Sequence, residues 1–571
     1  MLYPLSYEGA LPGELGYEHP GPGHYHRSAD PPSSAELGTM RDVLTSALRQ
    51  ALEGLGLDAP EEIHLEQPAR REHGDFSSNV AMKLAKPAGR PPRELAQDVV
   101  DRIAAALPEH VVGVEVAGPG FVNFRLDDGW LHDMVPTVLA AGDDFGRSDL
   151  GGGRKVMVEF VSANPTGPVH AGHARGAAYG DSLARLLAFT GHDVEREFYI
   201  NDRGVQMQTF AASLQARKEG REPEEGGYQG QYIIDWAAQM PDGVDPLEWG
   251  ERHALEDQRR VLARMNVEFD VWFSERAMVE TGAIDTTLAD LRARGVVDDA
   301  DGAVWLRSSE FGDDKDRVLV KSDGEYTYLL PDIAYHRDKF ARGFEQLINV
   351  WGADHHGYVP RMKAAVQALG HDPDDLEVVI TQLVRLEQGG EEVKISKRSG
   401  NLITLEELLD EVGVDAVRLT YLLQSVDSPQ TVDLDLIVAQ SNENPVFYVQ
   451  MANVRVRSIS RVAAERGLTQ RPLDQVDLSL MSHERELEIL RQLFVLPDVV
   501  ELAARERAPH KITTWVRELA GAVHGFYHDC PILSPDTPDD LRQARWWLAD
   551  AAGTGLRVGL DLLGVGAPER M

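Results

Sequence analysis

The spacing of apolar residues separates the chain into segments with different predicted structures. Apolar residues recur every three or four positions from Met40 onward and again over residues 92–106, and this periodicity is typical of amphipathic helices. Two apolar runs at 111–116 and 121–126, divided by a Gly-Pro-Gly turn, predict a pair of strands. We therefore expect residues 40–130 to form a small α+β domain of their own.

The middle of the chain alternates between strand-like and helical patterns. A Gly/Asp-rich linker at 142–153 precedes an apolar run at 155–161 that predicts a buried strand. Strand-like and helical patterns then alternate to about residue 405, with an insertion near 215–325. This order predicts a doubly wound, Rossmann-like α/β domain over residues 150–405.

The two ends of the chain differ from this middle part. Residues 406–571 have apolar positions at almost purely helical spacing, which predicts an all-α C-terminal bundle. Residues 1–39 are rich in Pro, Gly, Tyr and His without apolar periodicity, which predicts a disordered extension. The alternative is that translation starts at Met40. The expected fold class is α/β, with an α+β domain before the Rossmann-like domain and a helical bundle after it.

Charge adds a separate constraint. The 571 residues include 93 Asp and Glu against 57 Lys and Arg, a formal net charge of −36, and only 11 of those cations are lysines. Taken alone, this sign argues against a polyanionic partner. An acidic, lysine-poor surface also stays hydrated and dispersed in concentrated salt, where repulsion is screened. We therefore hypothesise a salt-adapted, halophilic cytoplasm.

Cysteine content and hydropathy exclude further classes of protein. The single cysteine, Cys530, makes an internal disulfide impossible and excludes a zinc site built on paired thiolates. No run approaches the roughly 18 consecutive apolar residues that a membrane span needs, and the N-terminus lacks a signal-peptide pattern. We expect a cytoplasmic protein with no structural zinc and no membrane contact.

Two histidines stand at a predicted helix start, directly after the strand at 155–161. The turn at 162–168 reads Ser-Ala-Asn-Pro-Thr-Gly-Pro and is followed by His-Ala-Gly-His. Such a turn is an anion site, because unpaired N–H groups and the helix dipole face the ligand. His170 and His173 share one face of the first turn, Gly172 leaves room for a flat ring, and paired donors suit charge growing on phosphoryl oxygens. The alternative is a helix start that merely carries two histidines.

A basic loop follows a predicted strand at 377–386. It carries Lys394 and Lys397 three positions apart in a chain with few lysines, and Gly400 allows the loop to bend. Mobile ammonium groups neutralise a polyphosphate as its bond to the transferred group breaks. The alternative is a solvated basic loop.

A third polar stretch follows the apolar strand at 347–350. Ligands of doubly wound sheets bind outside the carboxyl ends of strands, where Gly352, Asp354, His355 and His356 would lie. The aspartate and histidines could equally be metal ligands. No Cys or Glu-x-x-His pattern supports a metal nearby, so ribose and substrate contacts are preferred and no protein-held metal is predicted.

These stretches resemble known signatures. The H-A-G-H that begins at His170 and the K-I-S-K-R that begins at Lys394 are similar to the HIGH and KMSKS signatures of class I aminoacyl-tRNA synthetases. The resemblance spans residues 40–571. The further stretches that resemble arginyl-tRNA synthetases in particular are 159–168, 201–204, 328–335, 352–357, 415–418 and 444–450.

The resemblance implies ATP-dependent ligation of L-arginine to its tRNA through an arginyl-adenylate, with release of AMP and pyrophosphate. The family is also known for needing bound tRNA before it activates the amino acid. ATP is expected as its Mg²⁺ complex, without a protein cage for the metal. The catalytic residues that it implies are His170, His173, Lys394 and Lys397. The ATP-binding residues that it implies are Gly172, Gly352, Asp354, His355 and Ser396.

The resemblance also implies an arginine pocket. Its residues are Glu159, Asn164, Tyr328, Asp332 and His356. A guanidinium needs a carboxylate for its planar fork, and Asp332 follows a proline that the first turn of a helix tolerates. Asn164 is a candidate for the α-amino or carboxylate end of the substrate. The alternatives are that Tyr328 belongs to the core and that Glu159 is a structural ion partner.

Contacts with tRNA are expected at both ends of the chain. Arg455, Arg457 and Arg461 cluster without an acid, which favours phosphate contact; the alternative is an exposed helical face. Residues 451–454 depart from the aromatic and histidine that are usual in the family, which leaves the anticodon contacts undefined. The N-terminal domain resembles the domain that touches the tRNA elbow, with Asn79 as a candidate base reader.

The expected partners are therefore tRNA(Arg), L-arginine and ATP, and the expected state is a monomer. Three competing functions remain. Another class I synthetase would need a thiolate-bound zinc for cysteine, or a far larger editing insertion for branched residues. A smaller nucleotidyltransferase would leave the helical C-terminal region unexplained. A tRNA-binding protein without catalysis is disfavoured by the intact signature histidines and lysines.

Overall fold

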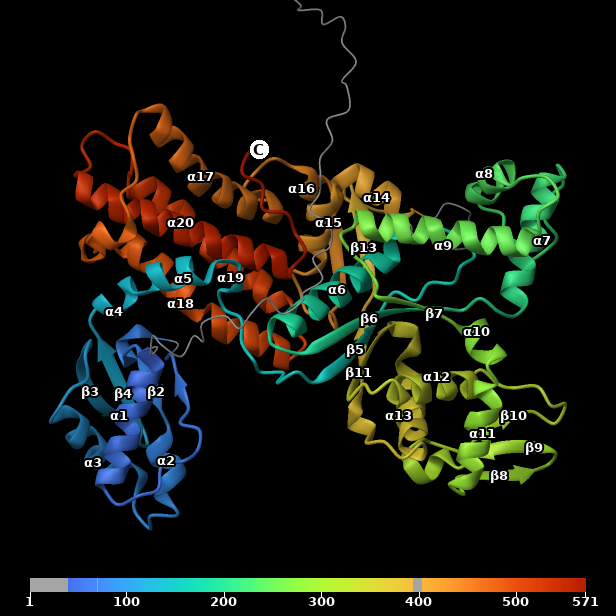
Figure 1. Ribbon diagram of the computed structural model, residues 1–571, viewed down its shortest axis with the longest axis horizontal. Coiled ribbons are helices and arrows are strands. Elements are labelled where there is room, and N and C mark those ends of the chain that lie inside the picture. Colours follow the sequence, from blue (N-terminus) through green and yellow to red (C-terminus); the bar gives the residue numbers. More distant parts are fainter. Residues whose placement is uncertain (1–39, 69, 394–402) are drawn as a thin grey trace, which may run out of the picture. The chain divides into compact units, whose positions relative to one another are not determined.

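The structure, a computed structural model, describes residues 40–68, 70–393 and 403–571 (Figure 1). Contacts within the chain divide it into two units, Met1–Trp130 and Leu131–Met571. In the part of the chain that the structure describes, no helix is long and apolar enough to span a bilayer.

In its described residues, the first unit is an antiparallel sheet of four strands in the order β1-β2-β4-β3, together with the α-helices α1, α2 and α3. Its first helix buries Leu44, Leu48 and Leu52, the stripe that helical spacing predicts. Phe76 and Phe124, on neighbouring strands, are wholly buried. The predicted N-terminal helix and both predicted strands are confirmed. The bounds are α1 (Met40–Gly54), β1 (Leu65–Glu66), β2 (Phe76–Ser78), α2 (Val80–Ala85), α3 (Pro92–Ala104), β3 (Val111–Ala117) and β4 (Phe121–Leu126), and α4 (Gly129–His132) follows.

The second unit is built on five parallel strands in the order β12-β11-β5-β6-β7. The chain adds β6 and β7 on one side of β5 and later adds β11 and β12 on the other side. The winding therefore reverses between β5 and β11, and ligands of such sheets bind in the crevice at this reversal. The predicted doubly wound fold is confirmed. The bounds are β5 (Lys155–Glu159), α6 (Ala174–Phe189), β6 (Asp193–Ile200), β7 (Val271–Ser274), α12 (Leu329–Ala341), β11 (Gln346–Gly352), α13 (Val359–Ala368) and β12 (Leu376–Thr381).

The strand β5 ends two residues before the predicted end at position 161. Val161 and Ser162 have φ angles of 68° and 42°, in the left-handed region that L-residues seldom adopt, so the chain leaves the sheet sharply after Phe160. Gly180 on α6 allows the helix to pack on this turn, because a Cβ there would lie 2.2 Å from the Phe160 ring. The single strand predicted at 377–386 is likewise divided into β12 and β13.

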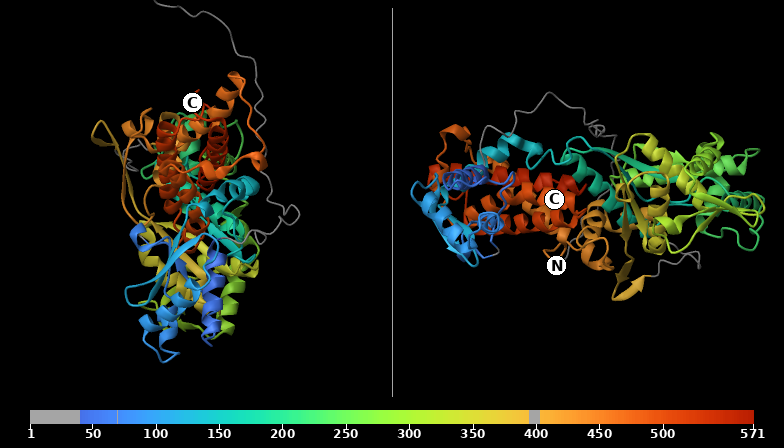
Figure 2. Two further views of the ribbon diagram at one scale, coloured as in Figure 1. Left: turned by 90° about the vertical axis from the view of Figure 1, so that its left-hand side faces the viewer. Right: turned by 90° about the horizontal axis from the view of Figure 1, so that it is seen from below.

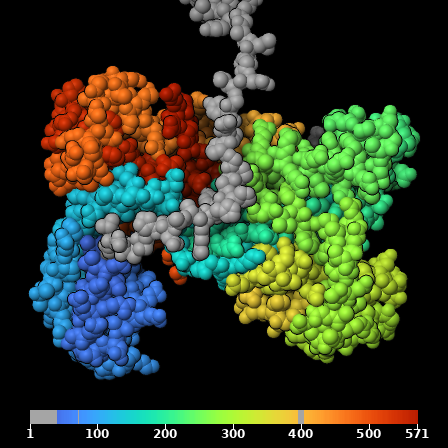
Figure 3. Space-filling view, in the orientation of Figure 1, coloured from blue at the N-terminus to red at the C-terminus, as the bar shows by residue number. Residues whose placement is uncertain are grey.

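The added structure near 215–325 lies in two parts, because β7 returns to the sheet between them. The first part packs around Phe210, Trp236 and Trp249 and forms a green lobe in Figure 3. The second part carries the antiparallel sheet β10-β9-β8. The bounds are α7 (Val205–Lys218), α8 (Gln231–Gln239), α9 (Pro246–Arg264), α10 (Glu275–Glu280), α11 (Ala283–Ala293), β8 (Val297–Ala300), β9 (Ala303–Leu306) and β10 (Arg317–Val320).

The C-terminal region is helical, as predicted, apart from one short strand, β15, that pairs with β13. Its long helices α17–α20 pack side by side (Figure 2). The bounds in this region are α14 (Leu405–Val412), α15 (Val414–Tyr421), β15 (Gln430–Asp433), α16 (Leu434–Val438), α17 (Pro445–Glu465), α18 (Glu484–Arg505), α19 (His510–Asp529) and α20 (Asp539–Leu562). The remaining elements of the second unit lie earlier in the chain and are α5 (Met134–Ala141), β13 (Val384–Gln388) and β14 (Glu391–Val393).

A wholly buried arginine joins this helical region to the sheet domain. Arg418 on α15 binds the Asp181 carboxylate on α6 at 2.6 Å. It also donates to the carbonyls of Leu563 at 2.9 Å and of Met265 and Asn266 at 3.0 Å. Buried charges need this degree of pairing. As a result α6, which begins directly after His173, is held by the helical region.

Candidate active site

The two signature histidines lie at the carboxyl edge of the sheet, where the chain that leaves β5 enters α6. His170 precedes a short 3₁₀ turn, Ala171–His173, and its Nδ1 accepts the backbone N–H of Gly172 at 3.1 Å. A neutral His170 therefore carries its proton on Nε2 and can donate it. The two imidazole centroids are 3.7 Å apart. A Cβ on Gly172 would lie 2.9 Å from the His170 ring, so this geometry requires glycine.

The turn before the histidines is held by two side chains of the inserted helices. Gln258 on α9 is wholly buried and donates its amide to the carbonyls of Asn164 and Gly167, both at 3.0 Å. Tyr232 on α8 donates its hydroxyl to the Thr166 carbonyl at 3.0 Å. These contacts fix the backbone that leads to the histidines. Gln258 and Tyr232 were not predicted from the sequence, because they lie far from this turn along the chain, in a segment that carries no motif.

The described end of the basic loop lies beside the histidine segment. The N–H of Ala171 donates to the Ile403 carbonyl at 3.0 Å, and the N–H of Leu405 donates to the Val169 carbonyl at 2.8 Å. Thr404 then caps α14 in a capping box. The structure thus places residues 403–405, which follow the second signature in the chain, against the segment that carries the first signature. The predicted residues Lys394, Ser396 and Lys397 lie outside the described residues.

Three carboxylates gather behind this edge, on β5, α10 and α12. Asp332, in the first turn of α12, accepts the Tyr358 hydroxyl at 2.6 Å. Burial raises the pKa of Asp332 to about 7, and the charges of Glu275 and Glu159 push it in the same direction. A cation bound beside these carboxylates would favour the ionised form of Asp332.

Glu275 is a site residue that sequence reasoning missed. It is the first residue of α10 and its carboxylate binds the Tyr199 hydroxyl and Arg203, whose Nη1 is 3.5 Å away. Burial raises the pKa of Glu275. The signal that could have found it is indirect: Arg203 belongs to the 201–204 stretch that resembles the family.

The remaining predicted residues have different environments. Asn164 is exposed and donates its amide to the Gln206 side chain at 2.8 Å. The side chain of Tyr328 is 89% exposed, so the alternative of a core tyrosine is wrong. Asp354, His355 and His356 are exposed on the 3₁₀ turn Ala353–Tyr358 that follows β11. Among the described residues, no three His, Cys, Asp or Glu side chains gather around a common metal position.

Together these features define a class of enzyme. A doubly wound parallel sheet, with paired histidines at the start of the helix that follows its first strand, is typical of class I aminoacyl-tRNA synthetases.

The comparison with protein families agrees with this class. A family model described as the catalytic domain of class I (R) tRNA synthetases matches residues 134–229 and 248–433. The arginyl-tRNA synthetase N-terminal domain matches residues 42–126, and the DALR anticodon-binding domain matches residues 449–571.

Individual proteins point to the particular family. The arginine–tRNA ligase of Geobacillus thermodenitrificans is 49% identical over 559 residues, covering 94% of this chain and 100% of that protein. Arginine–tRNA ligase 1 of Halalkalibacterium halodurans is 46% identical over 562 residues, with 94% and 100% covered. The Thermus thermophilus arginyl-tRNA synthetase structure shares the fold, with a TM-score of 0.72, 24% identity, and 93% and 100% covered. The chain belongs to the arginyl-tRNA synthetases and ligates arginine to tRNA.

Proposed function

We propose that the carboxyl edge of the sheet activates arginine in two chemical steps. The arginine carboxylate attacks the α-phosphorus of ATP, and pyrophosphate leaves as the arginyl-adenylate forms. A ribose hydroxyl of the terminal adenosine of tRNA then attacks the arginyl carbonyl, and AMP leaves. The observation that carries this proposal is the cluster of three carboxylates behind the histidine-bearing helix start.

In the arginine pocket, Asp332 takes the guanidinium of the substrate. Its carboxyl is half-buried, is fixed by Tyr358, and has no cation bound directly to it among the described residues. Glu159 adds a second acceptor at the end of β5. We assign Asn164 and His356 to the α-amino and carboxylate end, and Tyr328 to the entrance, because these three side chains are exposed.

On the nucleotide side, His170 and His173 donate to the phosphoryl oxygens on which charge grows in the transition state. The space that Gly172 leaves open suits the nucleotide, and Gly352, Asp354 and His355 suit its ribose at the end of β11. The proposed role of Lys394, Ser396 and Lys397 is to hold the departing pyrophosphate. ATP brings Mg²⁺ with its phosphates, and the protein supplies no cage of its own.

Contacts with tRNA are proposed for both units. In the first unit Asn79 stands at the N-terminus of α2, with its Oδ1 buried and without a hydrogen-bond partner among the described residues. In the second unit Arg455 contacts the His524 ring at 2.6 Å and lies over Tyr527. Arg457 and the exposed Arg461 follow on the same helix and are proposed to meet phosphates.

Finer features are also proposals. The domain boundaries at residues 130, 150 and 405 are proposed to separate the functional units. The enzyme acts as a monomer in a salt-rich cytoplasm. The acidic surface reflects this solvent rather than the partner, so tRNA recognition depends on hydrogen bonds, stacking and shape more than on bulk positive charge.

ATP–pyrophosphate exchange with each amino acid, with and without tRNA(Arg) and in high potassium, tests the proposed function. We expect exchange with arginine and with no other amino acid, because the proposed pocket is anionic. We expect this exchange only when tRNA(Arg) is present, because the family couples activation to tRNA. Exchange driven by another amino acid, or none with arginine and cognate tRNA, would overturn the proposal.

The pocket also predicts a pH dependence. Arginine carries its charge throughout the physiological range, and a cation binds the ionised form of Asp332. Because the pKa of Asp332 is raised to about 7 in the free protein, binding below that pH must displace a proton. The KM for arginine should therefore rise about tenfold for each pH unit below this midpoint and level off above it. Steady-state exchange from pH 5.5 to 8.5 measures this; a KM that is constant from pH 5.5 to 7 would contradict it.

A further inference from the structure

A wholly buried lysine lies behind the arginine pocket, outside the predicted site. The Lys339 ammonium, on α12, binds the Glu159 carboxylate at 2.6 Å and the Asn349 side-chain oxygen at 3.1 Å. It also lies 4.1 Å from the centroid of the Tyr335 ring. A charged lysine is almost never buried this completely unless it is paired. Its partner Glu159 is the last residue of β5, at the point where the sheet reverses its winding.

A directed chain of hydrogen bonds joins the same ammonium to the backbone carbonyl of Asp332. An ammonium only donates, so Asn349 must turn its oxygen to Lys339 and its amide to His336 Nε2, 2.9 Å away. His336 then donates through Nδ1 to the Asp332 carbonyl at 2.8 Å. This requires a neutral ring, and burial lowers the pKa of His336 to about 3. Lys339 thus contacts Glu159 directly and holds the turn that carries Asp332 indirectly.

The charges that face Asp332 come to a simple balance. The carboxylates are Asp332 itself, Glu159 and Glu275, and the cations are Lys339 on Glu159 and Arg203 on Glu275. The hydroxyls of Tyr358 and Tyr199 that bind these carboxylates are neutral. Further charges lie one contact away: Arg361 and Arg317 act on Tyr358, and Asp202, which is paired with Arg276, acts on Glu275.

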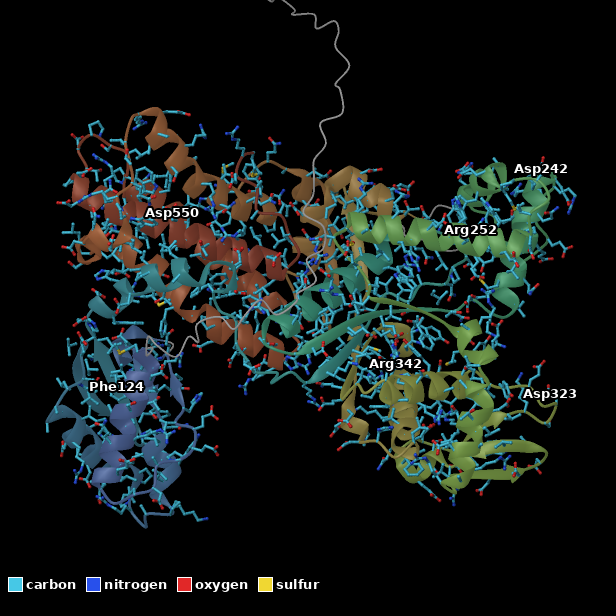
Figure 4. The ribbon with its side chains drawn as sticks, viewed as in Figure 1. Phe124, Asp242, Arg252, Asp323, Arg342 and Asp550 are labelled. Carbon is cyan, nitrogen blue, oxygen red and sulfur yellow. The ribbon has the colours of Figure 1, made fainter. Side chains whose placement is uncertain are left out.

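The nearby Glu197 does not enter this balance. It accepts the Tyr335 hydroxyl at 2.5 Å and is paired with Arg342 at 2.7 Å, which is labelled in Figure 4. With Asp332 ionised, the three carboxylates of this cluster meet the two cations bound directly to them, Lys339 and Arg203, and the remaining charge is the one that a single guanidinium neutralises.

We propose that Lys339 is a positioning residue for arginine binding: it fixes Glu159 and the Asp332 turn, and it sets the pocket to one net negative charge. The inference rests on the proposed function of this pocket. Removing the ammonium would leave two net charges in a buried space, so the pocket would take up a proton and arginine would have to displace it. A lysine that served the fold alone would alter stability without altering this proton competition.

The test is the pH midpoint of the KM for arginine, measured by tRNA-dependent exchange in four proteins. Lys339→Met should raise the midpoint by about one pH unit or more, which appears as a KM at pH 7 that is at least about fivefold higher. Glu159→Gln should lower the midpoint, because it removes a negative charge. The double variant Lys339→Met/Glu159→Gln should return to the wild-type midpoint, whatever its absolute KM.

We expect the pH midpoint to be lowest in Glu159→Gln, intermediate and equal in the wild type and the double variant, and highest in Lys339→Met. A midpoint that Lys339→Met leaves unchanged would overturn the inference. If that variant does not fold, the same question is answered in the Glu159→Gln background, where removing Lys339 should still raise the midpoint and an equal midpoint would overturn the inference.

Two further variants separate this inference from the proposed function. Lys155→Met removes a lysine from the opposite end of β5, where Nζ lies over Phe344, and should leave the midpoint in place. Asp332→Asn should abolish the midpoint. If Asp332→Asn keeps the midpoint, the pocket assignment fails and the role of Lys339 fails with it. If Asp332→Asn abolishes it but Lys339→Met does not move it, only the role of Lys339 fails.

Discussion

Replacing His170 by alanine should lower the rate of arginine-dependent ATP–pyrophosphate exchange by about 10²–10³-fold, the usual effect of removing one donor to a developing oxyanion. The structure gives a specific reason. The Nδ1 of His170 accepts the N–H of Gly172 at 3.1 Å, so a neutral ring carries its proton on Nε2 and can donate it to a phosphoryl oxygen. The kcat of exchange at saturating arginine, ATP and tRNA measures the effect, and the KM for arginine should change little.

Two variants control for loss of packing. His170→Gln places an amide N–H near the position of Nε2 and should recover part of the rate. His192→Ala removes a half-buried histidine beyond the other end of α6, where the ring binds the Leu187 carbonyl at 3.1 Å, and should leave the rate within about twofold. Equal losses in His170→Ala and His192→Ala would assign His170 to the fold instead of the reaction.

Asp332→Asn should raise the KM for arginine by at least about 100-fold, equivalent to about 3 kcal/mol, the cost of truncating a buried charge pair. Asparagine keeps the size of the side chain and can still accept the Tyr358 hydroxyl, which lies 2.6 Å from the Asp332 carboxyl. It loses the charge that a guanidinium needs. The KM for ATP should stay within about twofold, since the nucleotide is assigned to the other side of the edge.

Asp338→Asn is the matched control, on the same helix. Asp338 is half-exposed and binds Arg342 at 2.9 Å, away from the proposed substrate. Steady-state exchange with arginine varied should give it a wild-type KM. A similar rise in KM for both variants, or an unchanged KM for Asp332→Asn, would contradict the assignment of Asp332 to the guanidinium.

Much of the fold was predictable because its signals are local. The N-terminal helix follows from the spacing of Leu44, Leu48 and Leu52, and the alternation of strands and helices is sufficient to predict the doubly wound sheet. The end of β5 was not predictable, since residues 160 and 161 are as apolar as the strand itself. The left-handed backbone at Val161 and Ser162 is imposed by the structure around it.

The site divides in the same way. The histidine signature and the lysine signature are each a contiguous stretch of a few residues, so the sequence alone was sufficient to predict their chemistry. Glu275, Tyr199 and Lys339 have no motif of their own. Lys339 is 180 residues from Glu159, and a lysine in an amphipathic helix gives no sign that its ammonium is buried.

By itself, the sequence determined the class of enzyme and predicted the order of its domains and the residues proposed to meet phosphates, because short-range spacing and side-chain chemistry carry that information. Only the tertiary structure decided the electrostatics of the substrate pocket. The pKa of Asp332 is raised to about 7 by burial and by Glu275 and Glu159, which come from distant segments. Burial and charge proximity arise when the chain folds, and no local pattern encodes them.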